Sequence, residues 1–103
     1  MNINKLAIAW VELQKLDQKS ERTNELSWAS NELIRLVLFE FRGSWDVILE
    51  ILASTDDSWV IANLGAGPLE ELSRLYPVEF EASVKIEIKK NRKLKQAMTH
   101  VWL

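Results

Sequence analysis

Residues 78–88, which read VEFEASVKIEI, decide the fold class because their pattern fits two kinds of secondary structure. Apolar residues occupy every second position from Val78 to Ile88, which is the period of a half-buried strand. Phe80, Val84 and Ile88 are also spaced four residues apart, which places them on one side of a helix. Glu and Lys are frequent here and favour a helix. We therefore predict a helix, with a strand as the alternative.

A strand at residues 78–88 would need a neighbour to pair with, and the chain offers only one other stretch of strand character, residues 36–41. Any sheet would then be a minimal two-stranded one. The remaining segments repeat apolar residues every three or four positions, as amphipathic helices do. The sequence thus predicts an all-α fold, a compact bundle of five to seven short helices arranged as antiparallel helical hairpins. An α+β fold with a two-stranded hairpin is the minor alternative.

Capping residues predict where the first three helices begin and end. The first helix is expected to begin within residues 2–4, and the second to enter through a cap at residues 23–24. The second helix should end at residues 42–43. Ser44 is then the expected cap of the third helix, which should stop near residues 54–55.

Glycine and proline punctuate the second half of the chain. Residues 56–58 can cap a short fourth helix. Gly65 suits a left-handed helix end, and Pro68 suits the first position of a fifth helix that should end at residues 76–77. Together with the last two segments, these helices should form one core. The residues expected in it are Trp10, Leu33, Val37, Trp45, Leu52, Trp59, Leu72, Val84 and Trp102.

Length and composition indicate a single soluble domain, residues 1–103. The chain has 103 residues, of which 48% are hydrophobic and 27% charged, as in ordinary folded proteins. It has no cysteine, which excludes disulfides, thiolate zinc sites and a cysteine nucleophile. The longest uncharged stretch, residues 58–69, is too short and too broken to span a membrane. We expect a cytoplasmic protein without a membrane segment.

Charge is unevenly distributed along the chain. Its formal net charge is -2, but residues 42–76 carry two basic and six acidic side chains, and residues 77–103 carry six basic and three acidic ones. The basic run at residues 89–95 has no interleaved aromatic residue, so specific nucleic-acid recognition is not expected. The acidic middle is the better candidate for binding a partner.

None of the candidate motifs for chemistry is complete. Residues 65–68, GAGP, could cradle a phosphate, but Pro68 removes an amide and two glutamates follow directly. The paired carboxylates at residues 56–57 and 70–71 have no third ligand at a diagnostic spacing. His100 is the only histidine and has no nucleophile motif nearby. We expect no catalytic residues, no bound metal and no cofactor.

A family resemblance rests on residues 66–70, AGPLE, with Leu72 after them and Val101-Trp102 at the end. Trp10 and Trp45 resemble two earlier tryptophan positions of the same pattern. The chain is similar over nearly its whole length to a family of small bacterial proteins recorded only as a domain of unknown function. The resemblance implies an all-helical fold with a helix at residues 78–89, and it implies no catalytic residue. The chain departs from the pattern at residues 43–44, where a proline is expected.

These observations together predict a protein-binding module without enzymatic activity. The leading interpretation is a small immunity or antitoxin-like inhibitor that masks a basic toxin or effector through an acidic face. The expected contacts are Asp46, Glu50, Asp56, Asp57, Glu70 and Glu71. The alternative is a regulatory or scaffold protein that acts through helix–groove contacts or as a homodimer.

Overall fold

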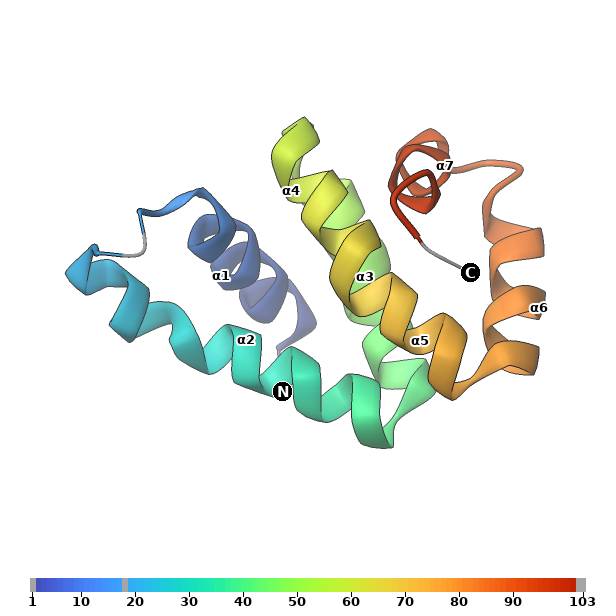
Figure 1. Cartoon of the computed structure of the whole chain (residues 1–103), viewed down its shortest axis with the longest axis horizontal. Coiled ribbons are helices and arrows are strands. Elements are labelled where there is room, and N and C mark those ends of the chain that lie inside the picture. The colour runs from blue at the N-terminus through green and yellow to red at the C-terminus, as the bar shows by residue number, and fades with distance from the viewer. Residues whose placement is uncertain (1, 18, 102–103) are drawn as a thin grey trace.

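The computed structural model describes residues 2–17 and 19–101, and all the regular structure within these ranges is helical (Figure 1). The all-α prediction is confirmed, and residues 78–88 lie almost entirely in a helix. The elements are α1 (Ile3–Lys15), α2 (Glu21–Phe39), α3 (Phe41–Ser54), α4 (Ser58–Leu64), the π-helical turn η1 (Gly65–Leu69), α5 (Glu70–Leu75), α6 (Pro77–Glu87) and α7 (Arg92–Met98).

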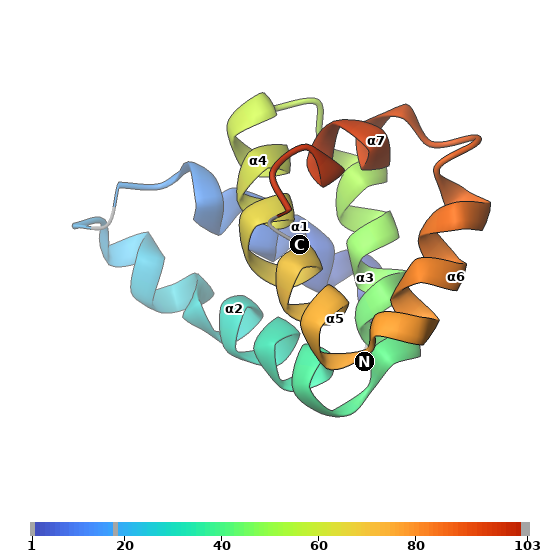
Figure 2. The ribbon, with the colours of Figure 1, turned by 45° about the vertical axis from the view of Figure 1, so that its right-hand side comes forward.

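The helices form two groups joined by a long central rod. In the first group α1 packs against both α2 and α3. The rod is the segment α4–η1–α5, which runs on as one nearly continuous helix in Figures 1 and 2. On its other side, α7 packs against α4 and η1, while α6 contacts α5 and lies at the edge of the molecule (Figure 2). The rod therefore contacts both the first and the last helix, α1 and α7.

Helix α6 shows why the pattern of residues 78–88 was ambiguous. Residues two apart lie on nearly opposite sides of a helix, so strict alternation produces two apolar stripes instead of one. Phe80 is buried, and its ring meets that of Trp45 edge-on, with centroids 6.1 Å apart. Val78 and Ile86 point away and are 76% and 69% exposed. One stripe thus joins the core and the other does not.

Most of the predicted core is confirmed. Trp10, Leu33, Val37, Trp45, Leu52 and Leu72 are buried, and Val84 is partly buried against them. The prediction was wrong for Trp59, which is 64% exposed because it lies in the first turn of α4, where Val60 and Ile61 face inward instead. Trp102 lies outside the described residues.

The predicted start of the second helix was wrong by a few residues. Helix α2 begins at Glu21, and its cap is Ser20, whose hydroxyl accepts a hydrogen bond from the backbone N–H of Arg22 at 3.2 Å. Thr23 and Asn24 lie inside the helix. A serine followed by a glutamate is a normal helix start. Ser20 is therefore as good a cap as Thr23 or Asn24, and the polar run before Leu26 does not show which of them is used.

The predicted junction between the second and third helices was also misplaced. Helix α2 ends at Phe39, and α3 begins at Phe41, because the backbone of Glu40 is extended with φ -143° and ψ 92°. Residues 42–43 are therefore helical. Ser44 is not a cap: it is buried in α3, and its hydroxyl donates to the carbonyl of Phe41 at 2.8 Å. Of the boundaries predicted around this junction and for the third helix, the end of the third helix near residues 54–55 is confirmed.

The predicted helix break at Gly65 does not occur. Gly65 has right-handed helical dihedral angles, φ -66° and ψ -49°, and begins η1. Pro68 lies inside this turn, and not at a first helical position, while the N–H of Glu70 reaches the carbonyl of Gly65 five residues back. Gly65 is needed for a different reason, since a methyl group there would overlap the backbone carbonyl oxygen of Ala97 in α7. The glycine lets two helices approach closely.

Candidate functional site

A pocket of about 440 Å³ opens between α1, α2 and the rod α4–η1–α5. We call it the α2 groove, because α2 supplies the largest part of its wall. Its lining consists mainly of apolar side chains with a few polar groups among them. The lining residues are Trp10, Gln14, Ser30, Leu33, Ile34, Val37, Leu38, Asn63, Gly67, Pro68 and Glu71. A pocket of this composition can bind an apolar group and orient it through a small number of polar contacts.

The apolar surface of α2 is wider than its packing against the rest of the protein requires. Leu33 and Val37 are buried and form part of the packing with the rest of the protein. Ile34 and Leu38 each follow one of them and are turned about 100° around the helix. They remain 55% and 47% exposed, although they line the pocket. Helix α2 therefore presents more apolar surface than its own fold covers.

The rod supplies the opposite wall through η1. Gly67 and Pro68 both line the groove, and Gly67 has open space where a side chain would begin. π-Helical turns inside α-helices are rare and occur frequently at functional sites. The irregular turn thus lies where the candidate site is.

Polar groups mark the rim of the groove. The side-chain amide of Asn63 donates to the side-chain oxygen of Gln14 at 3.2 Å, which ties α4 to α1. Glu71 is the one charged residue in the lining that the structure describes, and it forms an ion pair with Arg74 one turn further along α5. Both side chains of this ion pair are partly exposed, so the carboxylate can also meet a cation from solvent.

Asp56 and Asp57, two of the predicted contact residues, hold helices α4 and α7 in place. The carboxylate of Asp57 caps α4 by accepting hydrogen bonds from the N–H groups of Trp59 at 2.9 Å and Val60 at 3.2 Å. The carboxylate of Asp56 lies 2.9 Å from the ammonium of Lys93 in α7, whose hydrogen bond and charge lower the pKa of this carboxyl. The acidic middle and the basic end of the chain therefore meet in the fold.

The other four predicted acids are spread over two helices. Glu50 in α3 accepts a hydrogen bond from the side-chain amide of Asn4 at 2.8 Å, and Asp46 in the same helix is partly buried. Glu70 and Glu71 both lie in the first turn of α5, where negative charge is favourable. Glu71 is the one member of the predicted set that lines the α2 groove.

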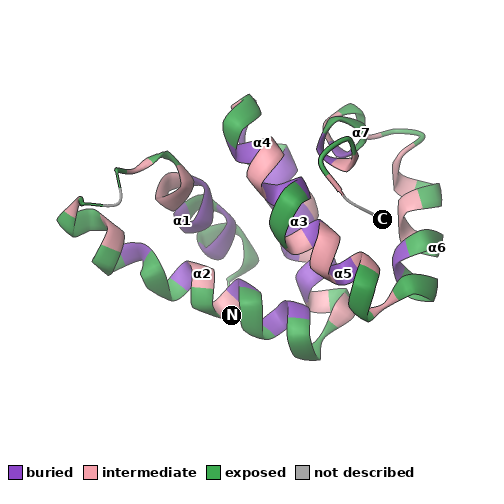
Figure 3. Ribbon diagram, in the orientation of Figure 1, coloured by how far each residue is buried: buried purple, intermediate pink, exposed green. Residues whose placement is uncertain are grey.

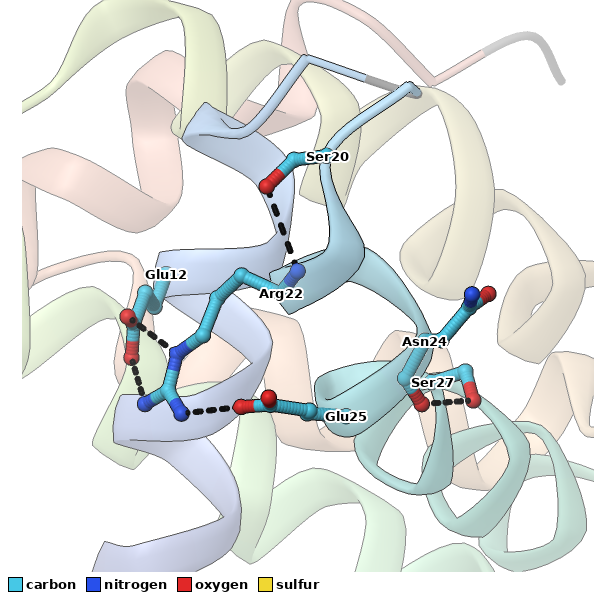
Figure 4. A network of polar contacts seen from close by, with 6 residues as sticks. All are labelled: Glu12, Ser20, Arg22, Asn24, Glu25 and Ser27. Atoms are coloured by element: carbon cyan, nitrogen blue, oxygen red, sulfur yellow. Dashed lines mark hydrogen bonds and ion pairs between the residues drawn. The ribbon is translucent and has the colours of Figure 1, made fainter.

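A further polar network joins α1 to the start of α2 (Figure 4). The guanidinium of Arg22 lies 3.1 Å from Glu12 on α1 and 2.7 Å from Glu25 on its own helix. These carboxylates raise the pKa of Arg22, mainly through the hydrogen bond with Glu12. In Figure 4 the side chain of Arg22 extends toward Glu12 and Glu25 together. The network holds one end of α2 against α1, and its exposed ion pairs are structural contacts.

The remaining candidate residues from the sequence do not come together into a site. His100 is exposed and follows the end of α7. Across residues 2–17 and 19–101, no three acidic or histidine side chains are placed to hold a metal ion. The same ranges contain no helix with the length and apolar character needed to cross a membrane.

The sequence prediction missed the α2 groove, although a signal for it was present. The adjacent apolar pairs at residues 33–34 and 37–38 make the apolar stripe of α2 wider than one packing contact requires. Such width shows excess apolar surface. It does not show which side of the stripe the fold leaves open, because that depends on where η1 and α5 lie.

Comparison with known proteins gives one family match. The model described as a family of unknown function (DUF6869) matches residues 16–103, which include α2 to α7. No curated protein and no solved structure matches the chain. The matched range contains every groove residue except Trp10 and Gln14.

Proposed function

The chain belongs to this family of unknown function, and we propose that it is a non-enzymatic protein-binding module. In this proposal it holds a helix of a partner protein in the α2 groove. The observation that carries the proposal is the exposure of Ile34 and Leu38, at 55% and 47%, beside a pocket of about 440 Å³. Apolar side chains gathered around a concavity are typical of protein-binding and ligand-binding surfaces.

A helix suits this groove better than a small molecule does. Pockets for small molecules bury most of the ligand surface, about 70–90% of it. Here Ile34 and Leu38 in the α2 wall are about half exposed, so the groove is open along α2. Amphipathic helices bind such grooves through apolar anchors spaced three and four residues apart. A basic residue on the bound helix would meet Glu71 at the rim.

The immunity or antitoxin-like role is a narrower form of this proposal and stays a prediction. It is supported by Glu71, which belongs both to the predicted acidic set and to the groove. Glu50, Asp56 and Asp57 already serve contacts within the protein. A partner that used them would have to share or replace those contacts, whereas the groove offers apolar surface that is already accessible. We therefore place the principal contacts in the groove.

The test compares proteins captured by three tagged baits from a lysate of the source organism. The baits are the natural chain, the groove variant Ile34→Asp/Leu38→Asp, and the control Ile8→Asp, which changes an exposed isoleucine outside the groove. We expect a stoichiometric partner that the natural chain and the control retain and the groove variant loses, at low and at high salt. Circular dichroism verifies that each bait is folded.

Other results would overturn the proposal. If the groove variant retains the same partner, or if no bait captures one, the groove is not the binding surface. If the partner is lost instead on reversing the acidic residues, for example with Glu50→Lys/Asp56→Lys, and is released by salt, the acidic face carries the binding and the inhibitor interpretation holds in its original form.

A further inference from the structure

The second apolar stripe of α6 is a feature outside the groove that the proposed function does not use. It consists of Val78, Ala82 and Ile86, which lie four residues apart on one side of the helix and are all exposed. In Figure 3 most of α6 is coloured as exposed, and the helix lies at the edge of the molecule. Three consecutive turns therefore present apolar side chains to solvent, although the opposite stripe already anchors α6 through Phe80.

We propose that this stripe binds the same stripe of a second copy of the chain, with the two α6 helices antiparallel and crossing at Ala82. In this arrangement Val78 of each copy lies against Ile86 of the other. The small side chain of Ala82 at the centre lets the helix backbones approach closely. The surface is separate from the α2 groove, so the inference goes beyond the proposed function.

Charge complementarity on α6 supports a second copy in the antiparallel direction. The first half of the helix carries Glu79 and Glu81, and the second half carries Lys85, followed by Lys89 just beyond its end. An antiparallel pair places the acidic half of each helix beside the basic half of the other, whereas a parallel pair would place like charges together. Glu87 does not disturb this pattern, because its largely buried side chain pairs with Lys90 at 3.7 Å.

One charge pair defines the arrangement more closely. Glu81 and Lys85 border the stripe on the same flank, where their side chains lie 3.9 Å apart within one molecule. A twofold axis through Ala82 brings the same flanks of the two helices together. Lys85 of each copy then lies next to Glu81 of the other. The two residues therefore contribute two equivalent ion pairs across the interface.

The test is sedimentation of the purified full chain across a range of concentrations. A standard interface buries about 800 Å² on each partner, and three helical turns offer less, so we expect a weak dimer that forms as the protein concentration is raised. The average mass should rise from the 11.9 kDa of one chain toward twice that value. Ile86→Asp should stay monomeric throughout, while the matched control Ile8→Asp should dimerise as the natural chain does.

Charge reversal tests the antiparallel arrangement independently of folding. Glu81→Lys and Lys85→Glu, measured separately, should each weaken self-association several-fold, because each places like charges across the interface. An equimolar mixture of the two variants should associate as strongly as the natural chain, since each interface pair is then of opposite charge. A natural chain that stays monomeric, a dimer that tolerates Ile86→Asp, or a mixture no stronger than its components would each overturn the proposal.

Discussion

Replacing Gly65 by alanine tests the close contact between the rod and α7. A Cβ at this position would overlap the carbonyl oxygen of Ala97 and come within 3.0 Å of the Cβ of His100. The carbonyl oxygen of Ala97 belongs to the backbone of α7, so no change of side-chain rotamer can remove the overlap. Either α7 shifts as a unit, or the rod bends away from it.

The expected cost follows from two opposing effects. Alanine is favoured over glycine inside a helix by about 1 kcal/mol. Overpacking a tight contact costs about 1–3 kcal/mol or more, and the contact of α7 includes the fully buried side chains of Leu94 and Ala97. Since the clash is with backbone, we place the cost at or above the upper end of that range. The net loss of stability should be about 2 kcal/mol, which in a domain of this size lowers Tm by roughly 10 °C.

Gly67 is the matched control, because it lies two residues away in the same π-helical turn and no atom beyond its own chain neighbours and helix backbone lies within 4 Å of the Cβ position. Gly67→Ala should change stability by less than about 1 kcal/mol, because the helix-propensity gain of alanine opposes the crowding of its Cβ against the ring of Pro68. Urea unfolding monitored by circular dichroism measures both variants and the natural chain. Equal stabilities for the two variants would refute the argument, since helix propensity alone treats both glycines alike.

Three further predictions concern charged residues and tryptophans. Asp57→Ala should destabilise the protein by about 1 kcal/mol through loss of the α4 cap, and chemical denaturation measures this loss. Lys93→Ala should raise the pKa of Asp56 toward its ordinary value, as followed by NMR titration. Because the pKa of Asp56 is lowered in the folded state, the contribution of this pair is present above the unfolded-state pKa and is lost as the pH falls below about 4. Trp45→Ala should lower the free energy of unfolding by about 3–5 kcal/mol, whereas Trp59→Ala should change it by less than about 0.5 kcal/mol. Unchanged stability of the Trp45→Ala variant would contradict the place of Trp45 in the core.

Helix content was predictable from the sequence because apolar spacing depends only on neighbouring residues. The helix at residues 78–88 required a weighing of alternation against propensity, and propensity was the better guide. The exact first and last residues of the helices were harder to predict. Ser20 and Thr23 are both acceptable caps, and the choice between them depends on how α1 and α2 pack.

Features that depend on packing between distant segments could not be predicted. The role of Gly65 depends on Ala97, which lies in a different helix. The exposure of Trp59 depends on which side of α4 faces inward, and this helix of 7 residues has only about two turns to indicate that side. The ion pair between Asp56 and Lys93 likewise joins regions that look separately charged along the chain.

The candidate site illustrates the same limit. Charge counts drew attention to six acids, and the structure brings one of them, Glu71, to the pocket. The exposed side chains of Ile34 and Leu38 could have been noticed as surplus apolar residues on α2. The groove beside them exists only because η1 and α5 lie opposite, and no local pattern contains that information.

The π-helical turn also fixes the rotational phase between the two halves of the rod. A π-helical turn accommodates one residue more than an α-helical turn, and each residue of an α-helix turns the chain by about 100°. Deleting a single residue such as Ala66 would therefore rotate the second half of the rod by about that angle relative to the first. Leu72, now fully buried, would turn out of the core, and Glu71 would leave the groove. The fold thus depends on the number of residues in this turn as well as on the absence of a side chain at Gly65.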